Sequence, residues 1–564
     1  MSESRLRGSR KDLMPLILAL VVLVAVLLGW WAVTQLVGGG GDVALPPGFT
    51  ITAGADSEGG GGRGETLGEL IAAAVPGENE GFQASIAILS LENQTGDTVF
   101  DTLGDGMVDE LFTRLSRIRG LKVISRQSVQ ELEGSTLTLA EVADTLGVDH
   151  LLRGRAYPYE EAARIQVELL QAEGERVLWG NDYSLDRTNQ MRAVEEISEE
   201  VGTALLEVVP ALSLRSSPRT TESPGYLAYR AGSRLLNTRT RDGLIRSIDA
   251  FQSAINLDGT LALAYAGLSS AYSLSVTYRY SIGVDAYAAS GLALRAAEES
   301  LRLDPELAEA YAARGYISSV ALAPAQSVLA DFTQAYELQP NAPNVASWLA
   351  NLLVREGYYD EALAEAQRAV DLDPLSPPRR TALAYEALRA RDYNLAMDQA
   401  RTALSLEPEV ILPRYIQGLA LLLSGRAEEC LELDLGPHAG LRAICLHALG
   451  RVEQATAIAD SLRTALQAGG QIHPEFTNVI PAGDLAAYLA WTGNPERALS
   501  WIHRAYALSP SGIDPRVLES GLFEDLLGNA AMRREVAEIR DRIWARVQRE
   551  EAEAGTGRLG RGNR

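Results

Sequence analysis

Four prolines recur along the second half of the chain at a nearly constant distance, and this spacing is the strongest constraint on the fold. They are 35, 34 and 34 residues apart: Pro305, Pro340, Pro374 and Pro408. Small residues precede them at helical spacing, as in Ala362, Ala366 and Ala369, which share one helix face. Repeats of this length are single helical units that bury their apolar faces only by stacking on neighbours. The sequence therefore predicts a mainly helical α-solenoid.

The repeat resembles the tetratricopeptide repeat in its length and in its residue pattern. The segment 357–374, GYYDEALAEAQRAVDLDP, is similar to the second half of that repeat, and the same phase recurs before other prolines. We expect about eight units in an array over residues 224–510. Capping helices over 515–549 would cover the last apolar face, as solenoids require, and a disordered tail is expected over 550–564.

In the tetratricopeptide family the concave groove of the array commonly binds extended or helical peptides, so the resemblance implies protein or peptide partners. The repeat phase predicts which first-helix positions point into this groove. Five candidate groove residues follow from it: Tyr316, Asn351, Arg355, Tyr385 and Arg389. An exposed polar residue of a solenoid is more often simply solvated, so each position has that alternative.

An uncharged apolar run lies near the N-terminus, from Leu13 to Val33. It is long enough to cross a hydrocarbon core of about 30 Å as a helix. A cleaved secretory signal is the alternative, but no small-x-small site follows closely, so we expect an uncleaved anchor. Basic residues precede the run, which predicts a cytoplasmic N-terminus over 1–12, a transmembrane helix over 13–37 and a flexible Gly-rich linker over 38–82. The following domains would then lie on the periplasmic side of a bacterial inner membrane.

Extended runs and helical segments alternate between this linker and the array, which predicts a small α/β domain. Several short motifs lie at the ends of these expected strands and helices. Their residues are Phe100, Gly104, Asp105, Gly106, Val123, Ser125, Arg126, Ser128, Leu146, Gly147, Val148, Asp149, Gly154, Leu178, Trp179 and Tyr183. With these motifs, residues 84–210 resemble the TolB-like (FlgO-like) domain of bacterial membrane regulators.

The domain departs from the TolB-like pattern at one place, because Leu91 stands where the family has an aromatic residue after the first strand. Nothing in the family's pattern implies catalysis. We expect Asp105 to be an N-terminal acid or cap of the first helix, with Gly104 and Gly106 as turn residues.

Charge and residue spacing disfavour several function classes. The net charge of −23 disfavours nucleic acid as a partner, since the arginines are interspersed with acidic residues. No hydrolase, kinase or phosphate-loop motif is present, so no catalytic, cofactor-binding or metal-ligating residue is proposed. Cys430 and Cys445 lack metal-ligand spacing; we expect two small buried hydrophobic residues, with a disulfide as the alternative.

Three functions from different classes remain open after these exclusions. The first is a membrane-anchored protein–protein interaction scaffold that binds peptides or proteins through its groove and its TolB-like domain. The second is a sensory or regulatory subunit whose cytoplasmic effector is on another chain. The third, an enzyme with an unrecognised site, is not favoured. The lipid bilayer is an expected partner through Leu13 to Val33, and self-association of the array is left open.

Overall fold

The computed structural model describes residues 67–74, 82–97, 99–118, 120–159, 162–185, 190–208, 224–469, 471–511, 523 and 529–554. Residues 69–564 form one compact unit. The expected transmembrane helix lies outside the described residues. No helix among the described residues is both long and apolar enough to span a bilayer. Within the predicted linker, a short helix α2 (Leu67–Ala74) is present.

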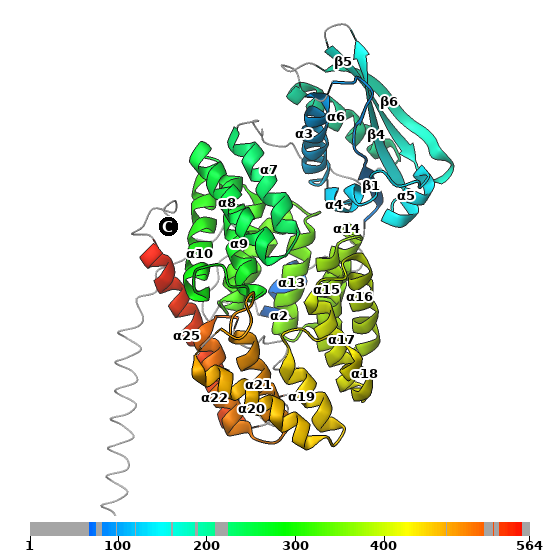
Figure 1. The fold of residues 1–564 in the computed structure, drawn as a ribbon. Coiled ribbons are helices and arrows are strands. Elements are labelled where there is room, and N and C mark those ends of the chain that lie inside the picture. The colour runs from blue at the N-terminus through cyan, green and yellow to red at the C-terminus, as the bar shows by residue number, and fades with distance from the viewer. Residues whose placement is uncertain are drawn as a thin grey trace, which may run out of the picture. The chain divides into compact units, whose positions relative to one another are not determined.

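The N-terminal part of the compact unit contains a six-stranded sheet of order β3-β1-β4-β5-β6, with β2 paired to β4. Strand β1 is parallel to both β3 and β4, whereas β4, β5 and β6 run antiparallel. The bounds are β1 Ala84–Ile88, β2 Glu92–Asn93, β3 Leu121–Val123, β4 His150–Tyr159, β5 Ala162–Gln171 and β6 Arg176–Leu185. The small sheet region expected from the sequence is therefore present (Figure 1).

Helices cover both faces of this sheet. Helices α3 (Val99–Leu115) and α6 (Gln190–Val208) share one apolar core with the sheet. Helices α4 (Arg126–Gln130) and α5 (Leu139–Leu146) supply residues to a second core on the other side. Helix α5 begins at a capping box and ends at Gly147, whose φ of 62° favours glycine.

The expectations for Asp105, Gly104 and Gly106 differ from the structure, since both glycines lie inside α3 and are not turn residues. Because α3 begins at Val99, Asp105 lies inside the helix and is not a cap; its carboxylate pairs with Arg126 at 2.7 Å. Leu91 makes a contact that explains two of the motif glycines. A Cβ at Gly104 would lie 2.8 Å, and one at Gly154 2.6 Å, from methyl carbons of Leu91. The leucine therefore occupies the space that both glycines leave open.

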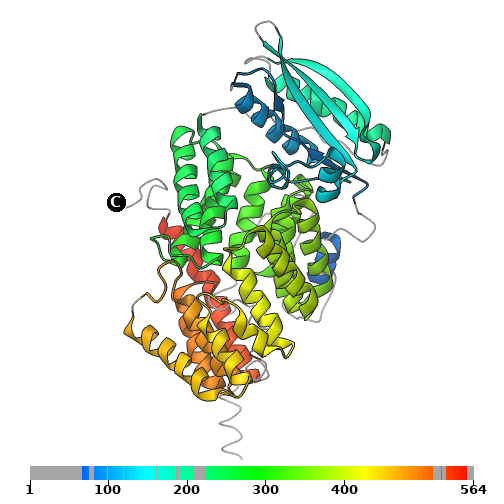
Figure 2. The same ribbon diagram turned by 45° about the vertical axis from the view of Figure 1, so that its right-hand side comes forward.

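The remainder of the described chain is a solenoid of helix pairs that resembles a tetratricopeptide array (Figures 1 and 2). Eight pairs are described, with these bounds: α7 Pro224–Asn237 and α8 Arg241–Leu257; α9 Ala262–Thr277 and α10 Ala286–Leu303; α11 Ala308–Val320 and α12 Ala325–Leu338; α13 Pro343–Arg355 and α14 Tyr359–Leu372; α15 Pro377–Arg389 and α16 Tyr393–Leu406; α17 Ile411–Leu423 and α18 Ala427–Glu432; α19 Ala439–Ala448 and α20 Val452–Ala468; α21 Val479–Trp491 and α22 Pro495–Leu508. Small residues allow the close packing within pairs. A Cβ at Gly315 would lie 2.8 Å from the ring of Phe332, which is fully buried.

The last repeats pack against the second repeat, so the array closes on itself. The Tyr287 hydroxyl in α10 donates to the carbonyl oxygen of Tyr506 in α22 at 2.6 Å. The loops after α9 and α20 also meet: the Thr477 N–H donates to the Arg279 carbonyl at 2.8 Å. Helix α25 (Ala530–Ala554) packs on both α10 and α22.

The C-terminal cap therefore differs from the one that the sequence predicts. A cap of the last repeat alone is expected, but a Cβ at Gly291 in α10 would lie 2.6 Å from the backbone of Glu550 in α25. The helix also continues to Ala554, into the segment 550–564 for which disorder is expected. Its contact with α10 explains why these residues are ordered as helix.

The sheet region contacts the solenoid through buried polar groups of two inter-repeat turns. The Asn341 side chain donates to the Ser116 carbonyl at 2.9 Å and accepts from the Val123 N–H at 3.3 Å. Asp373 is 3% exposed, and its carboxylate accepts hydrogen bonds from the hydroxyls of Ser125 and Ser128. The end of strand β3 is thus fixed to the repeats α11–α12 and α13–α14.

Candidate functional site

All five candidate groove residues line one cavity of about 400 Å³. They lie on the first helices of three consecutive repeats. Tyr316 lies on α11, Asn351 and Arg355 lie on α13, and Tyr385 and Arg389 lie on α15. The spacing of four residues within α13 and within α15 places each pair on one helix face. The repeat phase therefore identified side chains that the fold brings together.

Tyr316 belongs to an aromatic stack on this wall. Its ring lies 4.3 Å from that of Trp348 with an interplanar angle of 11°, and its hydroxyl donates to Thr277 Oγ1 at 2.8 Å. The sequence analysis did not include Trp348 among the candidate groove residues, although it lies three residues before Asn351 and hence on the same face of α13. This stack gives the cavity a flat apolar surface.

Arg355 and Arg389 line the cavity but are also engaged with the preceding repeat. Arg355 Nη1 donates to the Ser319 carbonyl, and Arg389 Nη2 donates to the Val354 carbonyl, both at 3.1 Å. These carbonyls lie at the C-terminal ends of α11 and α13, where a cation is favoured by the helix dipole. Both arginines therefore stabilise the stacking of repeats.

Another part of the cavity wall comes from loops that the sequence analysis did not single out. Tyr280 stacks on Phe476, with ring centroids 5.2 Å apart, where the loops after α9 and α20 meet. Burial raises the pKa of Tyr280, and the nearby Tyr278, Glu475 and Glu407 raise it further. These residues follow no repeat phase and are nearly 200 positions apart, so no sequence signal joins them.

Two buried arginines, Arg239 and Arg379, also line the cavity, each with 7% of its surface exposed. Burial lowers the pKa of Arg379 to about 10, and the neighbouring positive charge of Arg239 contributes to this lowering. Arg379 donates to the Ser347 hydroxyl at 3.3 Å and to the Asn344 side chain, both neutral acceptors. The cavity therefore contains two like charges close together.

The acid and base groups near the cavity do not form a recognisable catalytic set. His438 lines the cavity, stacks on Tyr415 at 3.9 Å, and has Nδ1 3.4 Å from Asp484 Oδ1. Asp484 also accepts the Gly440 N–H at 3.0 Å, so it fixes the start of α19. Among the described residues, no group of three or more His, Cys, Asp or Glu is placed to hold a metal ion.

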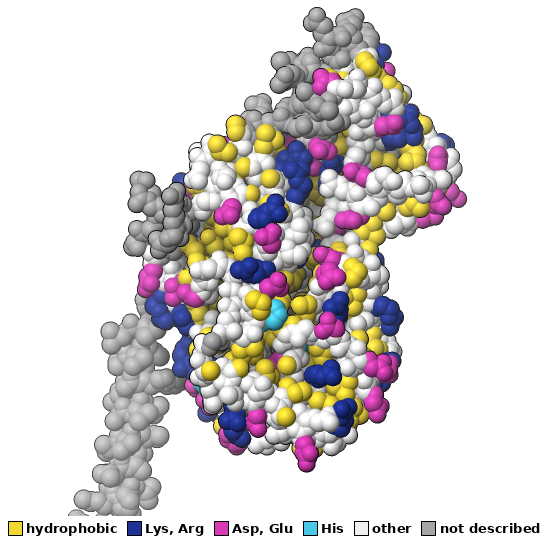
Figure 3. Space-filling model, in the orientation of Figure 1, with side chains coloured by type: hydrophobic (Ala, Val, Ile, Leu, Met, Phe, Trp, Pro, Cys, Tyr) yellow, Lys and Arg dark blue, Asp and Glu magenta, His cyan; other side chains and the backbone are white. Residues whose placement is uncertain are grey.

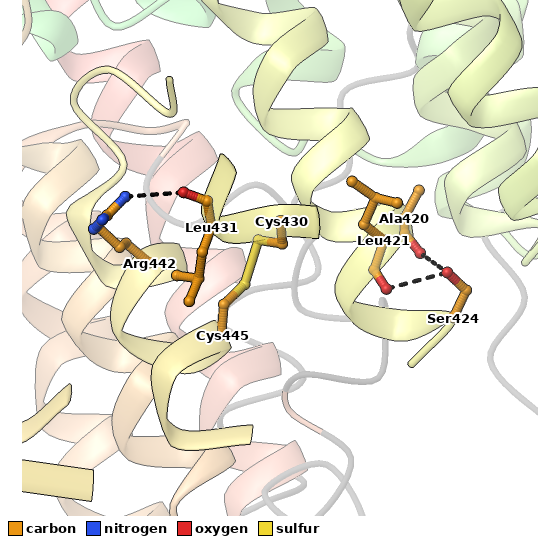
Figure 4. Close-up of a disulfide and its surroundings, with 7 residues drawn as sticks. All are labelled: Ala420, Leu421, Ser424, Cys430, Leu431, Arg442 and Cys445. Atoms are coloured by element: carbon orange, nitrogen blue, oxygen red, sulfur yellow. Dashed lines mark hydrogen bonds between the residues drawn. A yellow bond between two sulfur atoms is a disulfide. The ribbon is translucent and has the colours of Figure 1, made fainter. Parts of the chain in front are cut away.

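The two cysteines form a disulfide between α18 and α19 (Figure 4). Cys430 and Cys445 are both fully buried, with Cα atoms 6.6 Å apart. The expectation of two separate buried thiols is therefore wrong, and the alternative applies. The turn between the helices brings the side chains together, and Arg442 Nη1 beside them donates to the Leu431 carbonyl at 3.3 Å.

The surface over the solenoid mixes charges of both signs. On the face of the solenoid drawn in Figure 3, arginine side chains lie among aspartate and glutamate side chains, with apolar side chains between them. Six arginines line the cavity together with five acidic residues: Arg239, Arg241, Arg279, Arg355, Arg379 and Arg389, with Asp242, Glu386, Glu407, Glu409 and Glu475. The cavity is thus slightly basic in a chain of net charge −23.

Comparison with known proteins gives partial likenesses. Residues 82–200 match the family model described as HilA/YgeH-like transcriptional regulator, second domain. A Rhizobium meliloti (strain 1021) protein named adenylate cyclase 3 is 25% identical over 203 residues, which are 35% of this chain. The chain spans about a third of that relative's length, 34%.

Among solved structures, a thermophilic tetratricopeptide-repeat protein of Thermus thermophilus is similar at 17% identity, covering 35% of this chain and 99% of that one, with a TM-score of 0.29. YrrB, a tetratricopeptide-repeat protein with an unusual peptide-binding site, is similar at 21% identity, covering 33% and 87% with a TM-score of 0.21. The lipoprotein GNA1162 of Neisseria meningitidis is similar at 17% identity, covering 22% and 99% with a TM-score of 0.18.

Proposed function

We propose that this chain is a non-enzymatic scaffold of the bacterial inner membrane that binds protein or peptide segments on the periplasmic side. The observation that carries the proposal is the cavity of the solenoid. Five side chains chosen by repeat phase, from three consecutive repeats, line it together. Concave surfaces of helical repeats are the surfaces that such proteins use for binding.

The periplasmic location is supported by two independent features. The apolar run Leu13 to Val33 follows a basic segment, which favours export of the following domains. The bond between Cys430 and Cys445 is of a kind that persists in oxidising compartments such as the periplasm. The TolB-like assignment of residues 84–210 is part of the same proposal, since that family precedes repeats in membrane regulators.

Site-specific photo-cross-linking tests the binding role. A photoreactive amino acid replacing Asn351 in the cavity should cross-link to envelope proteins, whereas the same residue replacing Tyr359 on α14, outside the cavity, should not. Equal adducts from both positions, or none from Asn351, would contradict the proposal. Fusions of alkaline phosphatase and green fluorescent protein after Arg564 test the topology: an active phosphatase with a dark fluorescent fusion is expected, and the reverse would overturn it.

A sensory or regulatory subunit is the second candidate, and one contact favours it. Asp373 accepts from two serines of the sheet region, and its carboxylate lies 3.8 Å from Nε of Arg379, which lines the cavity. A ligand that attracts Arg379 would therefore act on the contact with the region that matches a domain of transcriptional regulators. This candidate predicts co-purification of a signalling protein, lost when Leu13 to Val33 is replaced by an unrelated span.

A further inference from the structure

Arg239 is held in the cavity by an unusual turn. It lies between α7 and α8 with a φ of 53°, a left-handed conformation that is costly for an arginine. The Tyr280 hydroxyl donates to its carbonyl oxygen at 3.1 Å and so fixes the turn from the neighbouring repeat. The structure thus keeps this side chain, which is 7% exposed, at the cavity wall.

The guanidinium of Arg239 is only partly satisfied within the described chain, although five acidic residues also line the cavity. Its Nη1 is buried without a hydrogen-bond partner, and no carboxylate of the described chain forms an ion pair with it. Arginine stays charged at physiological pH, so it cannot escape the cost of burial by losing its proton. Burying a charge without a partner is strongly unfavourable, which indicates that an acceptor is supplied from outside the chain.

Arg379, which lies near Arg239, is also incompletely satisfied by the described chain. Its hydrogen bonds go to the neutral side chains of Ser347 and Asn344, and its Nε has no hydrogen-bond partner. The nearest carboxylate, Asp373, lies 3.8 Å away and is already shared with two serine hydroxyls. Among the described residues, the two neighbouring guanidinium groups therefore have one carboxylate at ion-pair distance, that of Asp373.

The surroundings of this pair suit a flat apolar group. The Tyr316–Trp348 stack and the Tyr280–Phe476 stack both line the cavity. A volume of about 400 Å³ lies in the range of small-molecule sites. The loops after α9 and α20 meet at the cavity wall, where the Thr477 N–H donates to the Arg279 carbonyl.

We infer that the cavity binds a small organic anion, whose carboxylate or phosphate lies between Arg239 and Arg379 while its planar apolar part lies on the aromatic stacks. Guanidinium groups suit both oxyanions because their parallel N–H groups can donate to two oxygens at once. The inference rests on the proposed function in that the cavity is the binding site. It assigns the ligand class and the two residues that recognise the charge.

Isothermal titration calorimetry with three probes tests this site on the full-length protein in detergent. N-acetyl-L-phenylalanine supplies a carboxylate, phenyl phosphate supplies a phosphate, and N-acetyl-L-phenylalaninamide is the neutral control. At least one anion should bind about tenfold more tightly than the amide, and Arg239→Gln should weaken its binding about tenfold or more, whereas Arg401→Gln on the exposed surface should not. Which anion binds distinguishes the two oxyanions. Equal binding of all three probes, no binding of either anion at millimolar concentration, or unchanged affinity in Arg239→Gln would overturn the inference.

A second readout does not require the ligand. Because Arg239 is a buried charge whose Nη1 has no partner in the described part of the chain, Arg239→Met should raise the melting temperature of the ligand-free protein, or leave it unchanged, and should abolish the thermal shift given by the binding anion. A lowered melting temperature together with a retained shift would contradict the assignment. Cross-linking from Asn351 to a protein partner, measured in the same variant, separates failure of the anion site from failure of the scaffold function.

Discussion

Replacing Asp373 with alanine should detach the end of strand β3 from the solenoid. The carboxylate is buried and accepts hydrogen bonds from Ser125 and Ser128, the latter at 2.7 Å. Hydrogen bonds to a charged group contribute about 1.5–3 kcal/mol each. The substitution also removes the nearest counter-charge of Arg379, and breaking a buried pair typically costs about 3–5 kcal/mol. Because these contributions come from one carboxylate and are not additive, we expect a loss of roughly 3–5 kcal/mol in the local free energy of opening.

Native-state hydrogen exchange, read by mass spectrometry, measures this loss where it occurs. Peptides that cover residues 121–130 should exchange faster in Asp373→Ala, whereas peptides from α20 should keep their protection. Asp398→Ala is the matched control, because Asp398 pairs with Arg401 on the exposed surface and such pairs contribute at most about 1 kcal/mol. If Asp373→Ala changed the exchange of 121–130 no more than the control does, the contact would not stabilise the docking of the sheet region.

Three further predictions concern single elements. Thr138→Ala should lower the free energy of unfolding by about 1 kcal/mol, because it removes the cap of α5. Hydrogen bonds from Thr138 lower the pKa of Glu141, so the stability that Glu141 adds is present above the ordinary carboxyl pKa and is lost as the pH falls through the lowered pKa. The melting curves of Glu141→Gln and of the wild type should therefore converge in acid. Phe332→Ala should lower the free energy of unfolding measured in urea by about 3–5 kcal/mol, whereas Leu257→Ala, at an exposed position, should lower it by less than about 0.5 kcal/mol. Similar losses in the two variants would refute the packing argument. Cys430→Ser should cost about 3 kcal/mol, and reductant should reproduce that loss in the wild type but add nothing in the variant.

The parts of the fold that follow a repeat or a local signal could be predicted from the sequence. The proline spacing determines the phase of the helices, so Tyr316, Asn351 and Tyr385 were found to share a wall. The stop at Gly147 is likewise a local signal, because the chain there needs a positive φ.

The remaining features depend on contacts between distant segments. Arg239 lies in a turn outside the repeat phase, and Phe476 reaches the cavity only because the array closes on itself. Asp105 is another example. The Asp-Gly pair there suggested a helix start, but the helix begins six residues earlier, at Val99. The Asp105 carboxylate instead pairs with Arg126 from another element. The disulfide was left open since spacing alone does not determine whether two cysteines meet.

The closed array has a consequence for how the solenoid melts. An open solenoid frays from its ends, because a terminal repeat has one neighbour and loses only one interface when it unfolds. Here α25 and the loops that join Arg279 to Thr477 give the last pair, α21–α22, contacts with α9–α10 in addition to its contacts with the preceding repeat. Unfolding of α21–α22 then breaks two interfaces at once. We expect the seven pairs from α9 to α22 to lose their structure in one cooperative step, and with them the part of the cavity wall that they form.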